Sequence, residues 1–147
     1  MSFTIDLSRE IAAPAWVVWE VITDLPAYPE WNPFVIGCES TLVPGQSIHM
    51  RVKLLPWITQ SQTETVFENV ALERICYGIE RGPVRSRRCH QLRAIAVDRT
   101  RYDSHFRIAG PLAGLTRRLL GSRLRQGFEA MTEALARRAE QMAQLTR

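Results

Sequence analysis

The stretch IAAPAWVVWEVITDLPAYPEWNPFV, residues 11–35, decides the fold because its character changes twice within a short length of chain. It begins at the end of an alternating apolar segment, residues 3–11, which is typical of a β-strand. Ala13-Pro14 ends that strand, since proline cannot donate to a sheet ladder but suits the first turn of a helix. The sequence therefore predicts a strand followed at once by a helix.

The segment from Pro14 to Thr23 is predicted to be a short amphipathic helix. Its apolar residues recur at helical spacing on one face, at Ala15, Val18, Trp19 and Ile22. Asp24 and Pro26 can stop this helix and start a second, shorter turn over residues 27–31. The last eight residues, YPEWNPFV, combine two prolines with four bulky side chains and are too irregular for a strand.

Six segments of alternating character follow, each bounded by turn residues. They span residues 34–42, 47–55, 59–72, 74–81, 84–97 and 101–109. The clearest is 47–55, which places Ile48, Met50, Val52 and Leu54 on one face of a strand. The breaks between segments are short, so consecutive strands are expected to pair as antiparallel hairpins.

The chain ends in a long helical pattern from about Gly114 to Gln144. It contains no proline, and its apolar residues recur three, four or seven apart, at Leu120, Leu124, Phe128, Met131, Leu135 and Met142. A helix of roughly 30 residues would be about 45 Å long. Gly121 and Gly127 are expected points of bending or of close approach to a sheet or ligand.

This order predicts a single α+β domain over residues 1–147, with one antiparallel sheet of about seven strands. The long helix must lie across the apolar face of the sheet to bury both apolar stripes. A strongly curved sheet can leave an internal cavity between sheet and helix, closed at one end by the short helices.

Composition and hydropathy indicate the expected cellular location of the protein. The chain of 147 residues is 46% hydrophobic and 23% charged, which is ordinary for a soluble globular protein. No apolar run approaches the roughly 20 residues of a membrane span, and no signal peptide is visible. We therefore expect a cytoplasmic protein without stable membrane insertion.

Cysteine and histidine usage argues against a metal site. The three cysteines, Cys38, Cys76 and Cys89, are an odd number without C-x-x-C spacing, and they are predicted to be buried reduced thiols. The histidines show no metal-ligand spacing. We predict no metal and no cofactor.

The formal charge of +4 is the difference between 19 basic and 15 acidic residues, and all the basic residues but Lys53 are arginine. Eight arginines fall within residues 81–107, a density that could attract nucleic acid or an anionic membrane. They alternate with apolar residues, however, and no base-stacking aromatic motif accompanies them. The pattern favours a solvated sheet face, and we expect no nucleic-acid partner.

The quoted stretch contains I-x-A-P, then V-W, then a threonine-aspartate pair, then Y-P-x-W-x-P-F. With TRYDSHFRIAGPL (100–112) and GFEAMTEALARRAE (127–140), it resembles the START-like superfamily, also called SRPBCC or Bet v 1-like. Within that superfamily it is similar to the polyketide cyclase/dehydrase and lipid-transport group. The resemblance covers nearly the whole chain and implies a helix-grip fold with a hydrophobic ligand between the curved sheet and the long helix.

The resemblance implies a set of residues that face the ligand. Trp31 and Phe34 are expected to form a lid or wall, stiffened by Pro29 and Pro33, with Asn32 bonding free backbone groups. The other expected ligand-binding residues are Met50, Val52, Tyr77, Arg88, His90, Leu92, Phe106, Phe128 and Met131. Related sequences often carry an acidic residue where Phe106 stands, which suggests a less polar pocket here.

Arg88 and His90 are the leading polar candidates because they share a strand face with Leu92. A buried arginine or histidine needs partners, which a ligand oxygen, Glu64 or Glu80 could supply. Alternatively, His90 bonds a structural neighbour and the Arg88 side chain reaches the rim.

These residues favour binding or carrying of a small lipid-like or aromatic ligand. The alternative is a polyketide cyclase, aromatase or dehydratase that uses the same cavity, with His90 as base or Tyr77 as proton donor. No nucleophile elbow, phosphate-binding loop or carboxylate pair is recognisable, so no catalytic residue is assigned. A third class of function is an interaction module whose basic sheet face binds an anionic partner. The sequence is also compatible with a homodimer.

Overall fold

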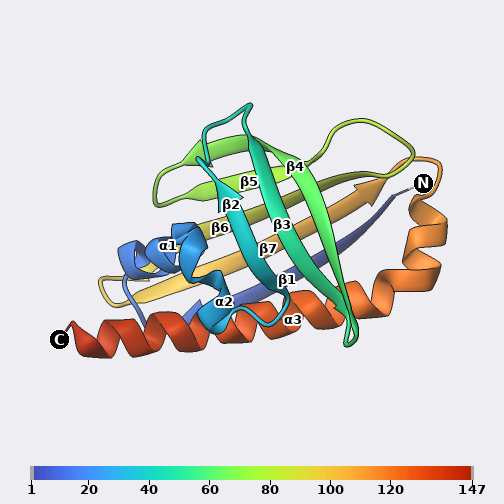
Figure 1. Cartoon of the computed structure of the whole chain (residues 1–147). Coiled ribbons are helices and arrows are strands. Elements are labelled where there is room, and N and C mark those ends of the chain that lie inside the picture. The colour runs from blue at the N-terminus through green and yellow to red at the C-terminus, as the bar shows by residue number, and fades with distance from the viewer. Residues whose placement is uncertain (1, 147) are drawn as a thin grey trace.

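The computed structural model describes residues 2–146 and has the predicted order of elements. Strand β1 (Ser2–Ile11) leads into α1 (Ala15–Thr23), a 3-10 turn (Leu25–Ala27) and α2 (Tyr28–Trp31). Six strands follow: β2 (Val35–Ser40), β3 (Ser47–Leu55), β4 (Ile58–Val70), β5 (Arg74–Ile79), β6 (Arg85–Ala96) and β7 (Arg99–Ala109). The chain then enters α3 (Ala113–Leu145), shown in orange and red in Figure 1.

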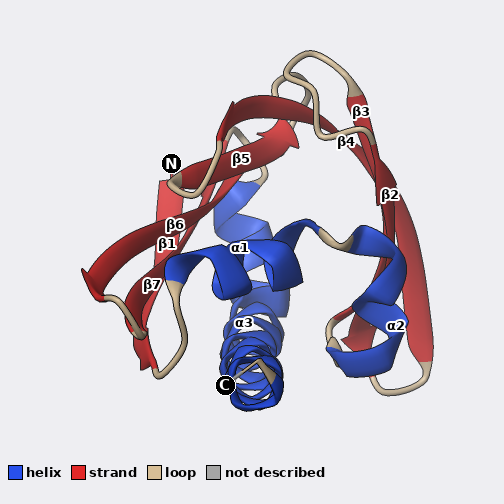
Figure 2. Cartoon of the chain, turned by 90° about the vertical axis from the view of Figure 1, so that its left-hand side faces the viewer, coloured by secondary structure: helices blue, strands red, loops and turns tan. Residues whose placement is uncertain are grey.

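The strands form one antiparallel sheet in the order β1-β7-β6-β5-β4-β3-β2. Figure 2 shows that this sheet curves around α3, with β1 and β7 on one side and β2, β3 and β4 on the other. The expected α+β helix-grip architecture is confirmed. The core lies between the concave face of the sheet and α3, where the inward residues Ile48, Met50 and Val52 of β3 are buried as their alternation predicts.

Helix α3 buries its predicted stripe, including Leu124, Phe128, Met131 and Leu135. Near its N-terminal end, in the orange part of Figure 1, the helix bends. Gly127 is a point of close approach, although to the ring of Phe34 just before β2 rather than to the sheet itself or to a ligand. A Cβ atom there would lie 2.3 Å from the ring carbons.

The buried face of α1 and the contacts of Asn32 can be compared with the expectations for the N-terminal region. The buried residues of α1 are Val17, Val18, Val21 and Ile22, so the buried face is shifted away from Ala15 and Trp19. This happens because α1 packs between α3 and the strands β6 and β7. The expected role of Asn32 is confirmed, since its Oδ1 accepts hydrogen bonds from the backbone N–H groups of Phe34 (3.0 Å) and Val35 (2.9 Å).

The prediction that all cysteines are buried reduced thiols is wrong. Cys76 on β5 and Cys89 on β6 stand directly opposite each other, with Cα atoms 4.2 Å apart, and their sulfur atoms are bonded. The strand register, which no sequence spacing reveals, brings the two residues together. Cys38 is free and only partly buried.

Replacing Gly127 by alanine should lower the free energy of unfolding by about 1–3 kcal/mol, because the new methyl group overlaps the Phe34 ring. Gly121→Ala is the matched control, since its Cβ would meet only the Arg117 Cγ at an ordinary 3.6 Å. That control should be neutral or stabilising by up to about 1 kcal/mol. Urea unfolding measures both. Equal stability of the two variants would contradict the packing of Phe34 on α3.

Candidate functional site

A cavity of about 320 Å³ lies between the concave face of the sheet and α3. Its inner wall consists of buried residues, namely Phe34, Val35, Met50, Val52, Glu64, Tyr77, Arg88, Phe106, Ile108, Leu124 and Phe128. Other lining residues are partly or fully exposed and mark the mouth: Leu54, Gln60 and Gln62 from β3 and β4, Ile79, Val84 and Ser86 around the β5–β6 loop, and Thr116 and Leu120 from α3. The cavity therefore opens beneath the N-terminal turns of α3.

Strand alternation brings the inner wall together from separate parts of the sequence. Met50 and Val52 on β3, Tyr77 on β5, Arg88 on β6 and Phe106 on β7 each occupy the inward phase of their strand. The ring of Phe128 on α3 lies 4.7 Å from that of Phe106 and 5.2 Å from that of Phe34, between ring centroids. The aromatic rings thus form one apolar wall.

Arg88 is the most unusual group in this wall, with only 4% of its surface exposed. Its guanidinium carbon lies 4.1 Å from the centroid of the Phe128 ring, and one Nη lies 3.6 Å from the sulfur of Met131. Between residues 2 and 146, no carboxylate is within ion-pair distance of Arg88, and its buried Nε–H has no hydrogen-bond partner. The guanidinium also interacts with the Tyr102 hydroxyl, whose pKa it lowers against the larger effect of burial. A buried cation held by a π face, a thioether and a neutral hydroxyl retains unused capacity for an anionic oxygen.

Glu64 on β4 supplies a second ionisable group to the lining. Burial raises the pKa of its carboxyl to about 7, opposed by a 2.7 Å hydrogen bond from Gln62 Nε2 and by the positive charge of Arg88. The carboxyl therefore changes its charge near neutral pH, which changes the net charge of the cavity wall.

A hydrogen-bonded chain of three rings lies at the back of the cavity. Tyr77 Oη is 2.9 Å from His90 Nε2, and Tyr102 Oη is 2.6 Å from His90 Nδ1. Burial and the charge of Arg88 keep the pKa of His90 well below its usual value, so its imidazole is neutral. Burial raises the pKa of Tyr77, so its hydroxyl stays protonated. Tyr77 lines the cavity, and its hydroxyl is held by the His90 imidazole behind it.

Seven of the expected ligand-binding residues line the cavity: Phe34, Met50, Val52, Tyr77, Arg88, Phe106 and Phe128. Four do not. His90 is shielded by Tyr77, and Leu92 lies deeper in the core. Met131 sits behind the Arg88 guanidinium, and the partly buried Trp31 packs edge-on against Tyr28 instead.

Glu64 is expected from the sequence only as a possible partner of Arg88, and Gln62 is not among the expected residues, although both line the cavity and share the inward phase of β4 with Val66. The alternation of residues along β4 could have indicated that both side chains face the cavity. Glu80, named as a partner for Arg88, is exposed and lies across the sheet, beside a shallow hollow on the outer face.

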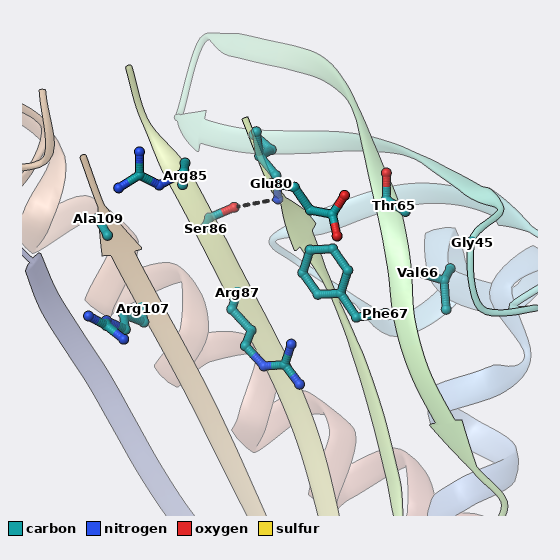
Figure 3. Close-up of a pocket in the computed structure, with 11 residues that line it drawn as sticks. Gly45, Thr65, Val66, Phe67, Glu80, Arg85, Ser86, Arg87, Arg107 and Ala109 are labelled. Atoms are coloured by element: carbon teal, nitrogen blue, oxygen red, sulfur yellow. Dashed lines mark hydrogen bonds between the residues drawn. The ribbon is translucent and has the colours of Figure 1, made fainter. Parts of the chain in front are cut away.

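Figure 3 shows this outer hollow, where Arg85, Arg87 and Arg107 project from β6 and β7. The guanidinium carbon of Arg87 lies 5.4 Å from the Phe67 ring centroid, and Arg87 also pairs with Glu68. Arg87 and Arg88 are therefore neighbours in sequence with opposite environments, one solvated and paired, the other buried and unpaired.

The described residues hold no group of three histidine, cysteine or acidic side chains close enough for a metal ion. From residue 2 to residue 146, no helix is both long and apolar enough to cross a membrane.

Glu64→Gln should raise the free energy of unfolding by about 1–3 kcal/mol at pH 8, with no gain near pH 4. The folded-state pKa of about 7 exceeds the ordinary 4.5, so the folded protein binds this proton more tightly than the unfolded chain. Stability therefore falls as the pH rises from about 4.5 to 7, and the variant removes that loss. Urea unfolding across this range measures the difference, with exposed Glu39→Gln as control. A pH-independent difference would contradict a buried Glu64 carboxyl.

Comparison with known proteins agrees with this architecture. The Zhui aromatase/cyclase from Streptomyces sp. R1128 is 19% identical, with a TM-score of 0.78 and coverage of 95% of this chain and 94% of that one. A START superfamily protein from Mycobacterium smegmatis is 18% identical, with a TM-score of 0.68 and coverage of 98% and 99%. Norcoclaurine synthase from Thalictrum flavum is 14% identical, with a TM-score of 0.71 and coverage of 97% and 96%. At these identities the likeness concerns the fold.

A search of curated protein sequences finds no match. The family model described as polyketide cyclase / dehydrase and lipid transport matches residues 2–140, almost the whole chain. The protein belongs to the polyketide cyclase/dehydrase and lipid transport family.

Proposed function

We propose that the protein binds one small, largely apolar molecule in its cavity and holds an anionic or strongly polar oxygen of that molecule against Arg88. The observation that carries this proposal is the buried guanidinium without a carboxylate partner. Burying such a charge is expensive, and a structural role would be served by a paired carboxylate or by an apolar side chain of similar size. A ligand oxygen supplies the missing partner.

The remaining lining supports an apolar body for the ligand. Phe34, Phe106 and Phe128 provide aromatic surface, and Met50 and Val52 provide aliphatic surface. Burial of apolar area contributes about 25 cal/mol per Å² before the cost of ordering the partners. A volume of about 320 Å³ is at the small end of the range for ligand pockets, which favours a compact ligand with few rings.

Family membership and structural neighbours support this proposal. The family description includes lipid transport and polyketide cyclisation, and both activities require a chamber for an apolar molecule. Neither name identifies the ligand of this chain, because one fold can host many functions.

We expect Arg88→Met to abolish the preference for an anionic ligand. A suitable probe pair is 2-naphthoate and the neutral 2-naphthalenemethanol, compared by titration calorimetry. A hydrogen bond to a charged group contributes about 1.5–3 kcal/mol, so the variant should bind naphthoate about 10–100-fold more weakly and the alcohol almost unchanged.

Arg87→Met is the matched control, since its side chain lies on the outer face and it should bind both probes as the original protein does. Unfolding of Arg88→Met should require at least as much urea as the original protein, because no ion pair is lost. If both variants lost naphthoate affinity equally, or if neither lost any, the assigned role of Arg88 would be contradicted.

A second candidate function is cyclisation of a polyketide-type chain, favoured by the Tyr77–His90–Tyr102 chain of hydrogen bonds. The Tyr77 hydroxyl can donate a hydrogen bond to a carbonyl oxygen in the cavity, which stabilises charge that develops on that oxygen during enolisation. The neutral imidazole of His90 fixes the orientation of this hydroxyl. Such a role would use the same cavity and the same anchoring arginine.

For this second candidate, the protein is added to a reconstituted synthase that releases poly-β-ketone chains, and the product distribution is measured. If the protein cyclises them, Tyr77→Phe should lower the yield of the directed product at least tenfold while naphthoate binding stays within about twofold. An unchanged product distribution on adding the original protein would refute the enzyme function and leave the binding function intact.

A further inference from the structure

The cavity mouth continues outward into an exposed apolar edge. Trp57 and Ile58, at the turn between β3 and β4, follow the lining residue Leu54, and Trp57 is 74% exposed. On the other side of the mouth, Leu115 and Leu119 accompany the lining residues Thr116 and Leu120, and Leu119 is 67% exposed. Such apolar side chains around an opening mark an interaction surface.

The two sides of this edge are joined by a hollow between the β3–β4 hairpin and α3. Lys53, Leu55 and Pro56 line it from the hairpin, and Arg123 lines it from the helix. Leu119 lies one helical turn before Arg123 and so shares its side of α3. We use the name mouth edge for Lys53, Trp57, Ile58, Leu115, Leu119 and Arg123.

The charge around the mouth edge has one sign. Residues 41–63 and 104–128, which include the hairpin and the first half of α3, contain no aspartate or glutamate. They contribute Lys53, Arg117, Arg118, Arg123 and Arg125 from the hairpin and α3, and Arg51 and Arg107 from the outward phase of their strands. Of these seven, only Arg125 forms an ion pair among the residues from 2 to 146, with Glu129. The mouth edge therefore combines exposed apolar groups with uncompensated positive charge.

We propose that the mouth edge docks the protein reversibly on an anionic lipid bilayer. Tryptophan and leucine side chains favour the interface of a bilayer, while nearby lysine and arginine are attracted to its negative surface at about 1 kcal/mol per residue. Docking in this orientation would place the cavity mouth against the lipid, where apolar molecules concentrate. The idea that docking gives the cavity access to apolar molecules rests on the proposed function. The docking itself can be measured without any ligand.

The basic outer face of the sheet fits this role less well. Three of its arginines pair with carboxylates, Arg87 with Glu68, Arg99 with Glu10 and Arg101 with Asp103. Arg85 and Arg107 form no ion pair among residues 2–146, but within that part of the chain no tryptophan or leucine lines the hollow beside them. An acidic protein could pair with the charges of the mouth edge, but its acidic groups would not explain why the indole of Trp57 is exposed there. The combination of indole, leucine and unpaired charge favours a lipid surface.

Sedimentation with vesicles tests the proposal. The intact protein should bind vesicles of phosphatidylglycerol and phosphatidylcholine at low salt, bind pure phosphatidylcholine at least tenfold more weakly, and dissociate as sodium chloride is added. Trp57→Ala/Leu119→Ala and Lys53→Gln/Arg123→Gln should each weaken binding to the anionic vesicles by roughly tenfold or more.

Matched controls change the same residue types elsewhere. Trp16→Ala/Val97→Ala removes exposed apolar groups from α1 and the β6–β7 turn, and Arg85→Gln/Arg93→Gln removes the same charge from the outer face of β6. Both should bind vesicles as the original protein does. Failure of the intact protein to bind anionic vesicles, or equal losses in the controls, would overturn the proposal.

Arg88→Met separates docking from ligand binding, because its side chain is buried in the cavity. This variant should bind vesicles normally while losing naphthoate. Naphthoate binding without vesicle binding would overturn docking alone, whereas vesicle binding without naphthoate binding would overturn only the proposed function.

Discussion

Helix α3 has to bury one long apolar stripe against a sheet that curves around it, and this constraint creates the cavity. The helix packs most closely on β1 at one edge of the sheet and also contacts β3 towards the other. Between these contacts the concave face recedes from the helix. The Phe34 ring fills part of the gap by packing on Gly127, and the unfilled part is the cavity. The fold therefore produces a binding chamber as a consequence of its own packing.

Electrostatics carry the specificity that we propose for this chamber. The Arg88 cation has a π face and a sulfur atom beside it but no carboxylate within ion-pair distance among residues 2–146. Glu64 also lines the cavity, and its carboxyl has a pKa of about 7. When Glu64 is protonated, Arg88 is the dominant charge of the cavity wall. When Glu64 ionises, its negative charge opposes an incoming anion. For the ligand that we propose, binding of an anion and solution pH would be coupled through these two residues on different strands.

The sequence predicts the architecture well because strand alternation and helical spacing report which residues face the core. The β3 strand has its predicted bounds, and Arg88 faces inward with Leu92 as its phase requires. Details that depend on strand register were not predictable. The Cys76–Cys89 bond and the shielding of His90 by Tyr77 both arise from pairing between residues on different strands. The raised pKa of Glu64 depends on burial, which alternation alone does not quantify.

A crystal structure of the protein with 2-naphthoate would test the central role of Arg88 most directly. The account predicts the naphthalene ring between Phe34, Phe106 and Phe128, with a carboxylate oxygen about 3 Å from the Arg88 guanidinium and its free Nε–H. An empty cavity, with naphthoate bound instead to Arg85 or Arg107 on the outer face, would contradict it.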